Sequence, residues 1–94
     1  MQIENVKPNK PVDDLIVEIK DFDEEREVMA KGKKSRVVNA KVGDETGELD
    51  MSLWNEEIDK VKVGDKIKIM KGFCFEFQNK PILGTGTFGS LEVL

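Results

Sequence analysis

The sequence predicts an all-β fold, a five-stranded Greek-key barrel with a short helix between the third and fourth strands. Short stretches in which apolar and polar residues alternate recur along the chain, as expected for strands that bury one face. Turns rich in glycine and aspartate separate these stretches, and one segment alone has helical spacing. With 94 residues, the chain predicts one domain over residues 1–94. It leaves open whether this domain stands alone or was excised from a longer protein with several such domains.

The first half of the chain predicts two strands joined by a basic loop. Residues 15–20 alternate, with three apolar side chains on one face, and this strand can continue, bent, as far as Val28. Residues 30–35 contain lysines and a glycine and predict a loop. Residues 36–42 then alternate again and predict the second strand.

The middle of the chain predicts a tight turn, a strand and the helix. Residues 43–47 contain aspartate and glycine, which favour a reversal. Residues 48–54 alternate as the third strand, and the alternation places Trp54 on its outer face. Asn55 is a suitable helix N-cap, followed by acidic residues that suit the first turn of a short helix.

The last third predicts two further strands. Residues 66–70 begin the fourth strand, residues 73–77 alternate after Gly72, and residues 82–94 form a final strand interrupted by glycines. Continued alternation from residues 67 and 69 would bury all three phenylalanines of residues 73–77 in the core. A single register change at Gly72 would instead turn Phe73 and Phe77 toward a groove and would leave open whether Phe75 lies in the core or the groove. Alternation alone favours the core. The order of strands and helix is that of the OB barrel, in which the helix closes one end.

The composition excludes several classes of function. The chain has no histidine and one cysteine, Cys74, so neither a zinc site nor an intrachain disulfide is expected. Without histidine, the commonest general acid–base residue is missing, and we expect no enzyme, no cofactor and no metal. No apolar run approaches the roughly 20 residues of a membrane span, and the N-terminus has no signal pattern. These features predict an intracellular, cytoplasmic protein.

The charge is unevenly distributed along the chain. The net charge is −4, but residues 31–43 carry five basic and no acidic side chains. Charges act over a screening length of about 8–10 Å, so a local basic segment matters more to a charged ligand than the total. This segment predicts contact with an anionic partner.

Three short motifs resemble a known family. Val-Gly-Asp-Glu-Thr-Gly at 42–47, Leu-Trp at 53–54 and Val-Gly-Asp at 63–65 resemble the single-stranded-DNA-binding OB domains of archaeal replication protein A and of the simpler archaeal single-strand-binding proteins. The likeness covers nearly the whole chain. It implies an OB barrel that binds single-stranded DNA without strong sequence preference, in replication, repair and recombination. It further implies a nucleoid-associated protein whose partners are single-stranded DNA, other OB domains or replication and repair proteins.

The resemblance also implies which residues bind. Its base-stacking positions correspond to Trp54, Phe73 and Phe77, and Phe75 is a further candidate although relatives usually carry a small or polar residue there. Cys74 and Glu76 depart from the family pattern as well. A simpler interpretation of Trp54 is that it ends its strand and folds over the helix. The basic residues expected to contact phosphates or polar groups are Arg26, Lys31, Lys33, Lys34, Arg36, Lys41 and Lys80.

Two other functions fit the same fold. The domain could serve as a protein-interaction module of a replication protein A complex, or it could bind RNA, which differs from DNA by its 2′-hydroxyl. The G-x-G-x-x-G pattern at residues 84–89 lacks the helix and the distant acidic residue of a dinucleotide site. The acidic run from Asp21 lacks the glycine and the final glutamate of a calcium loop, and we interpret it as a solvated acidic patch.

Overall fold

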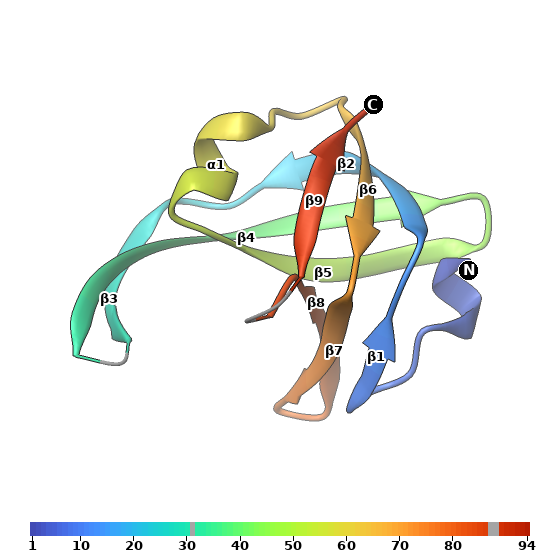
Figure 1. The fold of residues 1–94 in the computed structure, drawn as a ribbon, viewed down its shortest axis with the longest axis horizontal. Helices are drawn as coiled ribbons and strands as arrows, with labels where there is room; N and C mark the ends of the chain where they lie inside the picture. Colours follow the sequence, from blue (N-terminus) through green and yellow to red (C-terminus); the bar gives the residue numbers. More distant parts are fainter. Residues whose placement is uncertain (31, 87–88) are drawn as a thin grey trace.

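The computed structural model describes residues 1–30, 32–86 and 89–94, and Figure 1 shows them as one strongly curled sheet. Within this part of the chain there are nine strands, in the hydrogen-bonded order β1-β7-β8-β5-β4-β2-β6-β9, with β3 paired to β4. The β5–β8 pair is parallel and the other pairs are antiparallel. The strands are β1 (Lys10–Val12), β2 (Leu15–Phe22), β3 (Arg26–Ala30), β4 (Lys33–Asp44), β5 (Gly47–Trp54), β6 (Lys66–Met70), β7 (Gly72–Phe77), β8 (Lys80–Gly84) and β9 (Ser90–Val93).

The core lies inside the curl of the sheet and is built from alternating apolar residues. Leu15, Val17 and Ile19 of β2 are buried, and Ile67 and Ile69 of β6 are buried opposite them. Each fully buried side chain of this size contributes about 1.5–3 kcal/mol. Because successive side chains of a strand point to opposite faces, the intervening residues of these strands lie on the outside of the curl.

The β4–β5 hairpin forms the longest pair of strands, and Asp44 holds its turn. One carboxylate oxygen of Asp44 accepts hydrogen bonds from the backbone N–H of Thr46 at 2.7 Å and from its hydroxyl at 2.6 Å. The other accepts from the N–H of Ile3 at 2.8 Å, which attaches the short 3-10 helix η1 (Ile3–Asn5) to the turn. Burial raises the pKa of Asp44, but these hydrogen bonds outweigh it and hold the pKa below its usual value.

The helix α1 (Glu56–Lys60) is a short element that follows β5 and precedes β6. Figure 1 shows it at one end of the sheet, next to the end of β5, while the β3–β4 hairpin extends beyond the body of the molecule. Of the helices in residues 1–30, 32–86 and 89–94, none is long and apolar enough to cross a membrane.

The structure corrects the prediction of five strands. The sheet is all-β and OB-like, but the described residues form nine shorter strands, and α1 follows β5 rather than lying between strands three and four. Local breaks explain the difference. The acidic residues 23–25 separate β2 from β3, and Lys71, with a φ of 53°, separates β6 from β7. A positive φ is rare outside glycine, so an alternating pattern alone does not predict such a break.

Candidate nucleic-acid interface

Four neighbouring strands, β4, β5, β8 and β7, present one continuous outer face. Their registers align side chains in rows, with Lys41 of β4 opposite Asp50 of β5. Asp50 lies beside Ile82 of β8, which lies opposite Phe75 of β7. Neighbouring strands are about 4.8 Å apart, so this row crosses roughly 15 Å of sheet. We call this surface the aromatic face, after its residues Trp54, Phe73, Phe75 and Phe77.

A change in the backbone at Lys71 turns the side chains of β7 around. Ile69 is buried, but Lys71 has a φ of 53° and the next buried residues are Gly72 and Cys74. A Cβ on Gly72 would lie 2.7 Å from the Cγ2 of Ile69 and 2.8 Å from the carbonyl oxygen of Gly84, so a side chain at this position would force its neighbours to shift. The alternation from β6 therefore does not continue into β7, and the core takes the small Cys74 in place of the phenylalanines.

The three phenylalanines of β7 consequently lie on the outer surface. Phe75 is 46% exposed and Phe77 62% exposed, while Phe73 is half-buried. The rings of Phe73 and Phe75 are 5.0 Å apart with planes at 54°. A Cβ on Gly84 would lie 3.4 Å from the ring of Phe75, so the ring lies over β8. Glu76 has the inward parity of Cys74, yet it is exposed because the strand ends there.

Trp54 ends β5 at the opposite side of the aromatic face. Its side chain is 37% exposed and lies opposite the buried Val37 of β4. Its backbone N–H donates to Oε1 of Glu57 at 3.0 Å. The next residue, Asn55, has a φ of 51° and exchanges hydrogen bonds with Arg36: its side-chain oxygen accepts from the N–H of Arg36 at 2.9 Å, and its own N–H donates to the carbonyl of Arg36 at 3.0 Å. The end of β5 is thus anchored on both sides.

The β3–β4 hairpin carries several of the expected basic residues. Arg26 begins β3, where it lies opposite Val37, the same residue that pairs with Trp54 on the other side. Lys33 and Lys34 begin β4 and are exposed. Lys31 lies outside the described residues. Arg26 therefore lies in the same cross-strand row as Trp54, whereas Lys34 and Lys33 lie three and four residues from Val37 along β4, toward the tip of the hairpin.

Two further lysines lie on the aromatic face itself. Lys80 begins β8 and is opposite Phe77. The Nζ of Lys41 forms an ion pair with Oδ1 of Asp50 at 3.3 Å. Both partners are substantially exposed, and such a pair contributes only about 0–1 kcal/mol. A phosphate group of a ligand could therefore compete with Asp50 for Lys41.

Arg36 lies against α1 in an ion-pair network. One of its terminal nitrogens is 2.8 Å from Asp59 and donates to the carbonyl of Asn55 at 3.1 Å, and the other is 3.6 Å from Glu25. The hydrogen bond between Arg36 and Asp59 raises the pKa of the arginine and lowers the pKa of the carboxyl. The structure thus assigns Arg36 contacts that anchor β4 to the helix, in addition to its predicted contact with phosphate.

Comparison with known proteins decides the family. The family model for the Ssb-like OB fold of single-stranded DNA binding proteins matches residues 6–92. The chain belongs to this family. The single-stranded DNA binding protein Ssb of Saccharolobus solfataricus is 28% identical to the Ssb-like domain over 86 residues, which cover 92% of this chain and 58% of the relative. The domain thus spans little more than half the length of that protein.

Solved structures show the same fold as the Ssb-like domain. An OB domain from Thermoplasma acidophilum has a TM-score of 0.84 at 18% identity, with 100% of this chain and 85% of the other covered. The second OB-fold domain of replication protein A from Methanococcus maripaludis has a TM-score of 0.79 at 22% identity, with 100% and 93% covered. At these identities the likeness concerns the fold.

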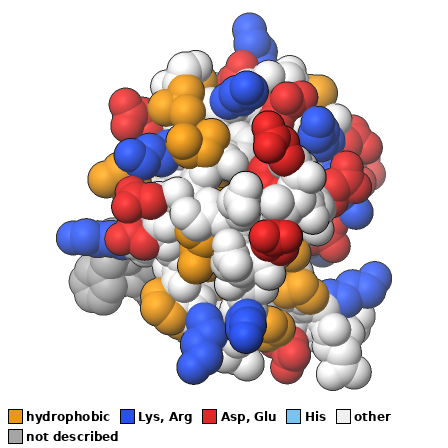
Figure 2. All heavy atoms as spheres, turned by 90° about the vertical axis from the view of Figure 1, so that its right-hand side faces the viewer, with side chains coloured by type: hydrophobic (Ala, Val, Ile, Leu, Met, Phe, Trp, Pro, Cys, Tyr) orange, Lys and Arg blue, Asp and Glu red, His pale blue; other side chains and the backbone are white. Residues whose placement is uncertain are grey.

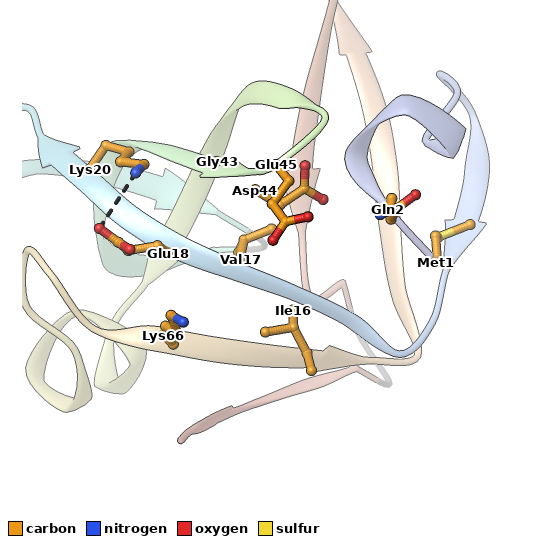
Figure 3. A pocket seen from close by; sticks show the side chains of 10 residues that line it. All are labelled: Met1, Gln2, Ile16, Val17, Glu18, Lys20, Gly43, Asp44, Glu45 and Lys66. Carbon is orange, nitrogen blue, oxygen red and sulfur yellow. Dashed lines mark hydrogen bonds and ion pairs between the residues drawn. The ribbon is translucent and has the colours of Figure 1, made fainter.

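A separate hollow of about 510 Å³ lies away from the aromatic face of the Ssb-like domain. Figure 3 shows it between the N-terminal residues, β2 and the turn of the β4–β5 hairpin. Figure 2 shows the N-terminal side of the molecule, where acidic, basic and hydrophobic side chains are interspersed. In the part of the chain that the structure describes, no three His, Cys, Asp or Glu side chains are grouped so that they could hold a metal ion. The aromatic face is the stronger candidate because the exposed rings of Trp54, Phe75 and Phe77 share this surface with Lys41 and Lys80.

Three residues support the aromatic face although the sequence pattern does not single them out. Gly84 leaves room for the ring of Phe75. Glu57 binds the backbone of Trp54 and also the hydroxyl of Thr85. The acidic residues after Asn55 predict favourable charge at a helix start. No local signal shows that the carboxylate of Glu57 accepts a hydrogen bond from Thr85, 28 residues later.

Proposed function

We propose that this Ssb-like domain binds single-stranded DNA across the aromatic face, in replication, repair and recombination. Successive bases stack on Trp54 and on the rings of Phe73, Phe75 and Phe77. The sugar–phosphate backbone of the bound DNA runs past cations at both ends of the aromatic face. Those expected to contact phosphates are Arg26, Lys31, Lys33, Lys34, Arg36, Lys41 and Lys80.

The observation that carries this proposal is the outward orientation of three phenylalanines in one strand. An aromatic side chain buries 150–250 Å² when it is placed in a core, so two exposed rings and a half-buried one in a domain this small forgo a large stabilisation. The register change at Lys71 and the absence of a side chain at Gly72 are what expose them. Flat rings in a row suit unpaired bases, because every base has a π face.

Stacking supplies most of the affinity in this proposal. Each stacked base contributes roughly 1–3 kcal/mol, so four rings supply about 4–12 kcal/mol before the cost of ordering the strand. Electrostatics contributes less, because the net charge of the chain is −4 and Lys41 is already paired with Asp50. If the domain neutralises three or four phosphates, a plot of the logarithm of the binding constant against the logarithm of the salt concentration has a slope of about −2 to −3.

Titration of the intrinsic fluorescence of Trp54 with oligo-dT tests the proposal directly, since the chain has one tryptophan. An oligomer of about 12 nucleotides spans a single OB domain. We expect saturable quenching, and weaker binding when Trp54 is replaced by alanine, the latter followed with a labelled oligomer. Undiminished binding by Trp54→Ala together with a salt slope near zero would contradict the mechanism.

Two arms of the same titration separate the other functions. An oligo-rU of the same length competes poorly with oligo-dT if the face prefers DNA. It competes equally well if the face accepts both DNA and RNA. Absence of any quenching by either oligomer would favour a protein-interaction module over a nucleic-acid-binding domain.

A further inference from the structure

The side chain of Glu57 joins the start of α1 both to the end of β5, three residues before it, and to Thr85, 28 residues after it. It belongs to the first turn of α1, and its Oε1 accepts the hydrogen bond from the backbone N–H of Trp54 at 3.0 Å. Its Oε2 accepts from the hydroxyl of Thr85 at 2.6 Å. Hydrogen bonds to a charged group are short and about twice as strong as neutral ones, so one carboxylate ties the end of β5 to the residue that follows β8.

Both tied residues lie at the aromatic face. Trp54 is itself a candidate stacking residue, and Thr85 directly follows Gly84, which is the register partner of Phe73 and lies beneath the ring of Phe75. The register pairs between β5 and β8 are Asp50 with Ile82 and Met51 with Leu83, which lie before Trp54. Beyond them, the carboxylate of Glu57 is a bridge between the two strands.

We propose that Glu57 is a positioning residue that fixes the spacing between Trp54 and the phenylalanines of β7. This inference rests on the proposed function, because the spacing matters only if successive bases stack on both groups. Thr85 is the partner of Glu57 in this role. The side chain of Thr85 is buried, so its hydroxyl would be left without an acceptor if the carboxylate were removed, which is costly in a buried site.

A role of Glu57 through its charge alone and a role in positioning predict opposite effects of its removal on DNA binding. A carboxylate beside the binding face repels a polyanion, so its removal should tighten binding if Glu57 acts only through its charge. Positioning predicts that Glu57→Ala weakens binding, because both hydrogen bonds are lost. Glu57→Gln keeps an oxygen that can accept from the N–H of Trp54 and an amide that can donate to the hydroxyl of Thr85. The glutamine variant therefore separates the geometry from the charge.

The experiment compares Glu57→Ala, Glu57→Gln and the matched control Glu56→Ala, whose side chain precedes it on the same helix and is exposed. Binding to labelled oligo-dT is measured at low salt, with urea unfolding of each variant. We expect Glu57→Ala to bind about tenfold more weakly, the loss of one stacked base. We expect Glu57→Gln and Glu56→Ala to bind within about twofold of the unaltered domain, because neither loses the bridge.

A second measurement reports on Trp54 without any DNA. If Glu57 holds the end of β5, the fluorescence anisotropy of Trp54 falls in Glu57→Ala and is retained in Glu57→Gln. Thr85→Val, which removes only the hydroxyl, should weaken binding in the same direction and act non-additively with Glu57→Ala.

The outcomes separate this inference from the proposed function. Tighter binding by both Glu57 variants, or unchanged binding by Glu57→Ala, would overturn the positioning residue while single-stranded DNA binding stands. Failure of the unaltered domain to bind any oligomer would overturn the proposed function instead. In that case an unchanged anisotropy of Trp54 in Glu57→Ala would also refute the bridge.

Discussion

Replacement of Phe75 by alanine tests whether all of β7 contributes to binding. The ring is 46% exposed and lies over Gly84, so roughly half of its surface is already buried. Full burial of a phenylalanine contributes about 1.5–3 kcal/mol, and its partial burial therefore about 1–1.5 kcal/mol to the free energy of unfolding. Loss of one stacked base costs about 1–3 kcal/mol in binding, which is roughly fivefold to 150-fold in Kd.

The assay follows the quenching of Trp54 by oligo-dT and the urea unfolding of the same preparation. Ile16→Ala is the matched control, because Ile16 is 47% exposed but lies on β2, away from the aromatic face. We expect both variants to unfold at slightly lower urea, and the affinity to fall only for Phe75→Ala. Equal affinity of Phe75→Ala and the unaltered domain would refute stacking at this position, and equal weakening by Ile16→Ala would show that stability, rather than stacking, controls binding.

Three more changes are predicted from other parts of the structure. Gly72→Ala should destabilise the domain by about 1–3 kcal/mol in urea unfolding, because its Cβ meets a carbonyl oxygen at 2.8 Å, whereas Gly47→Ala, with a contact of 3.5 Å, should be nearly neutral. Asp44→Asn should reduce stability at pH 7. The pKa of Asp44 is lowered in the folded protein, so its carboxylate stabilises the fold above the unfolded pKa near 4, and this stabilisation disappears as pH falls through the folded pKa. The free energies of unfolding of the two proteins should therefore converge at lower pH. Lys33→Ala combined with Lys34→Ala should make the salt dependence of binding shallower by up to about 1.4 in slope. An unchanged slope would show that the β3–β4 hairpin does not contact the bound DNA.

The sequence predicts the elements whose alternation is uninterrupted. Residues 48–54 form most of β5 and residues 66–70 form β6. Met51, Leu53, Ile67 and Ile69 are buried and Leu49 is half-buried on the expected face, because a period of two leaves only one choice of inward face. The inward face of β7 could not be predicted in this way. Its direction depends on the left-handed conformation of Lys71 and on the close approach of Ile69 and Gly84 to Gly72. Gly72 marks the place of a register change in the sequence, but the alternation does not show that the change occurs.

The basic segment shows a second limit of sequence reasoning. Residues 31–43 form one block of positive charge in the sequence, but their ion-pair partners belong to other elements of the fold. Arg36 pairs with Asp59, 23 residues away, and Lys41 pairs with Asp50 across the hairpin. The composition of the block predicts attraction of an anion, whereas the fold decides which of its cations meet that anion and which hold strands and helix together.

Cys74 and Glu76, which depart from the family pattern, have a common explanation in the orientation of β7. Once the phenylalanines face outward, the core has to accept the residues between them, and there is room for a small apolar side chain such as that of the buried Cys74. Burial raises the pKa of its thiol, which keeps it neutral in the core. Glu76 has the same parity but lies at the exposed end of the strand, where its charge stays in water. A carboxylate at position 74 would have to be buried instead, at a cost of several kcal/mol. The order of cysteine and glutamate along β7 is therefore what allows three aromatic rings to remain on the outer surface of so small a domain.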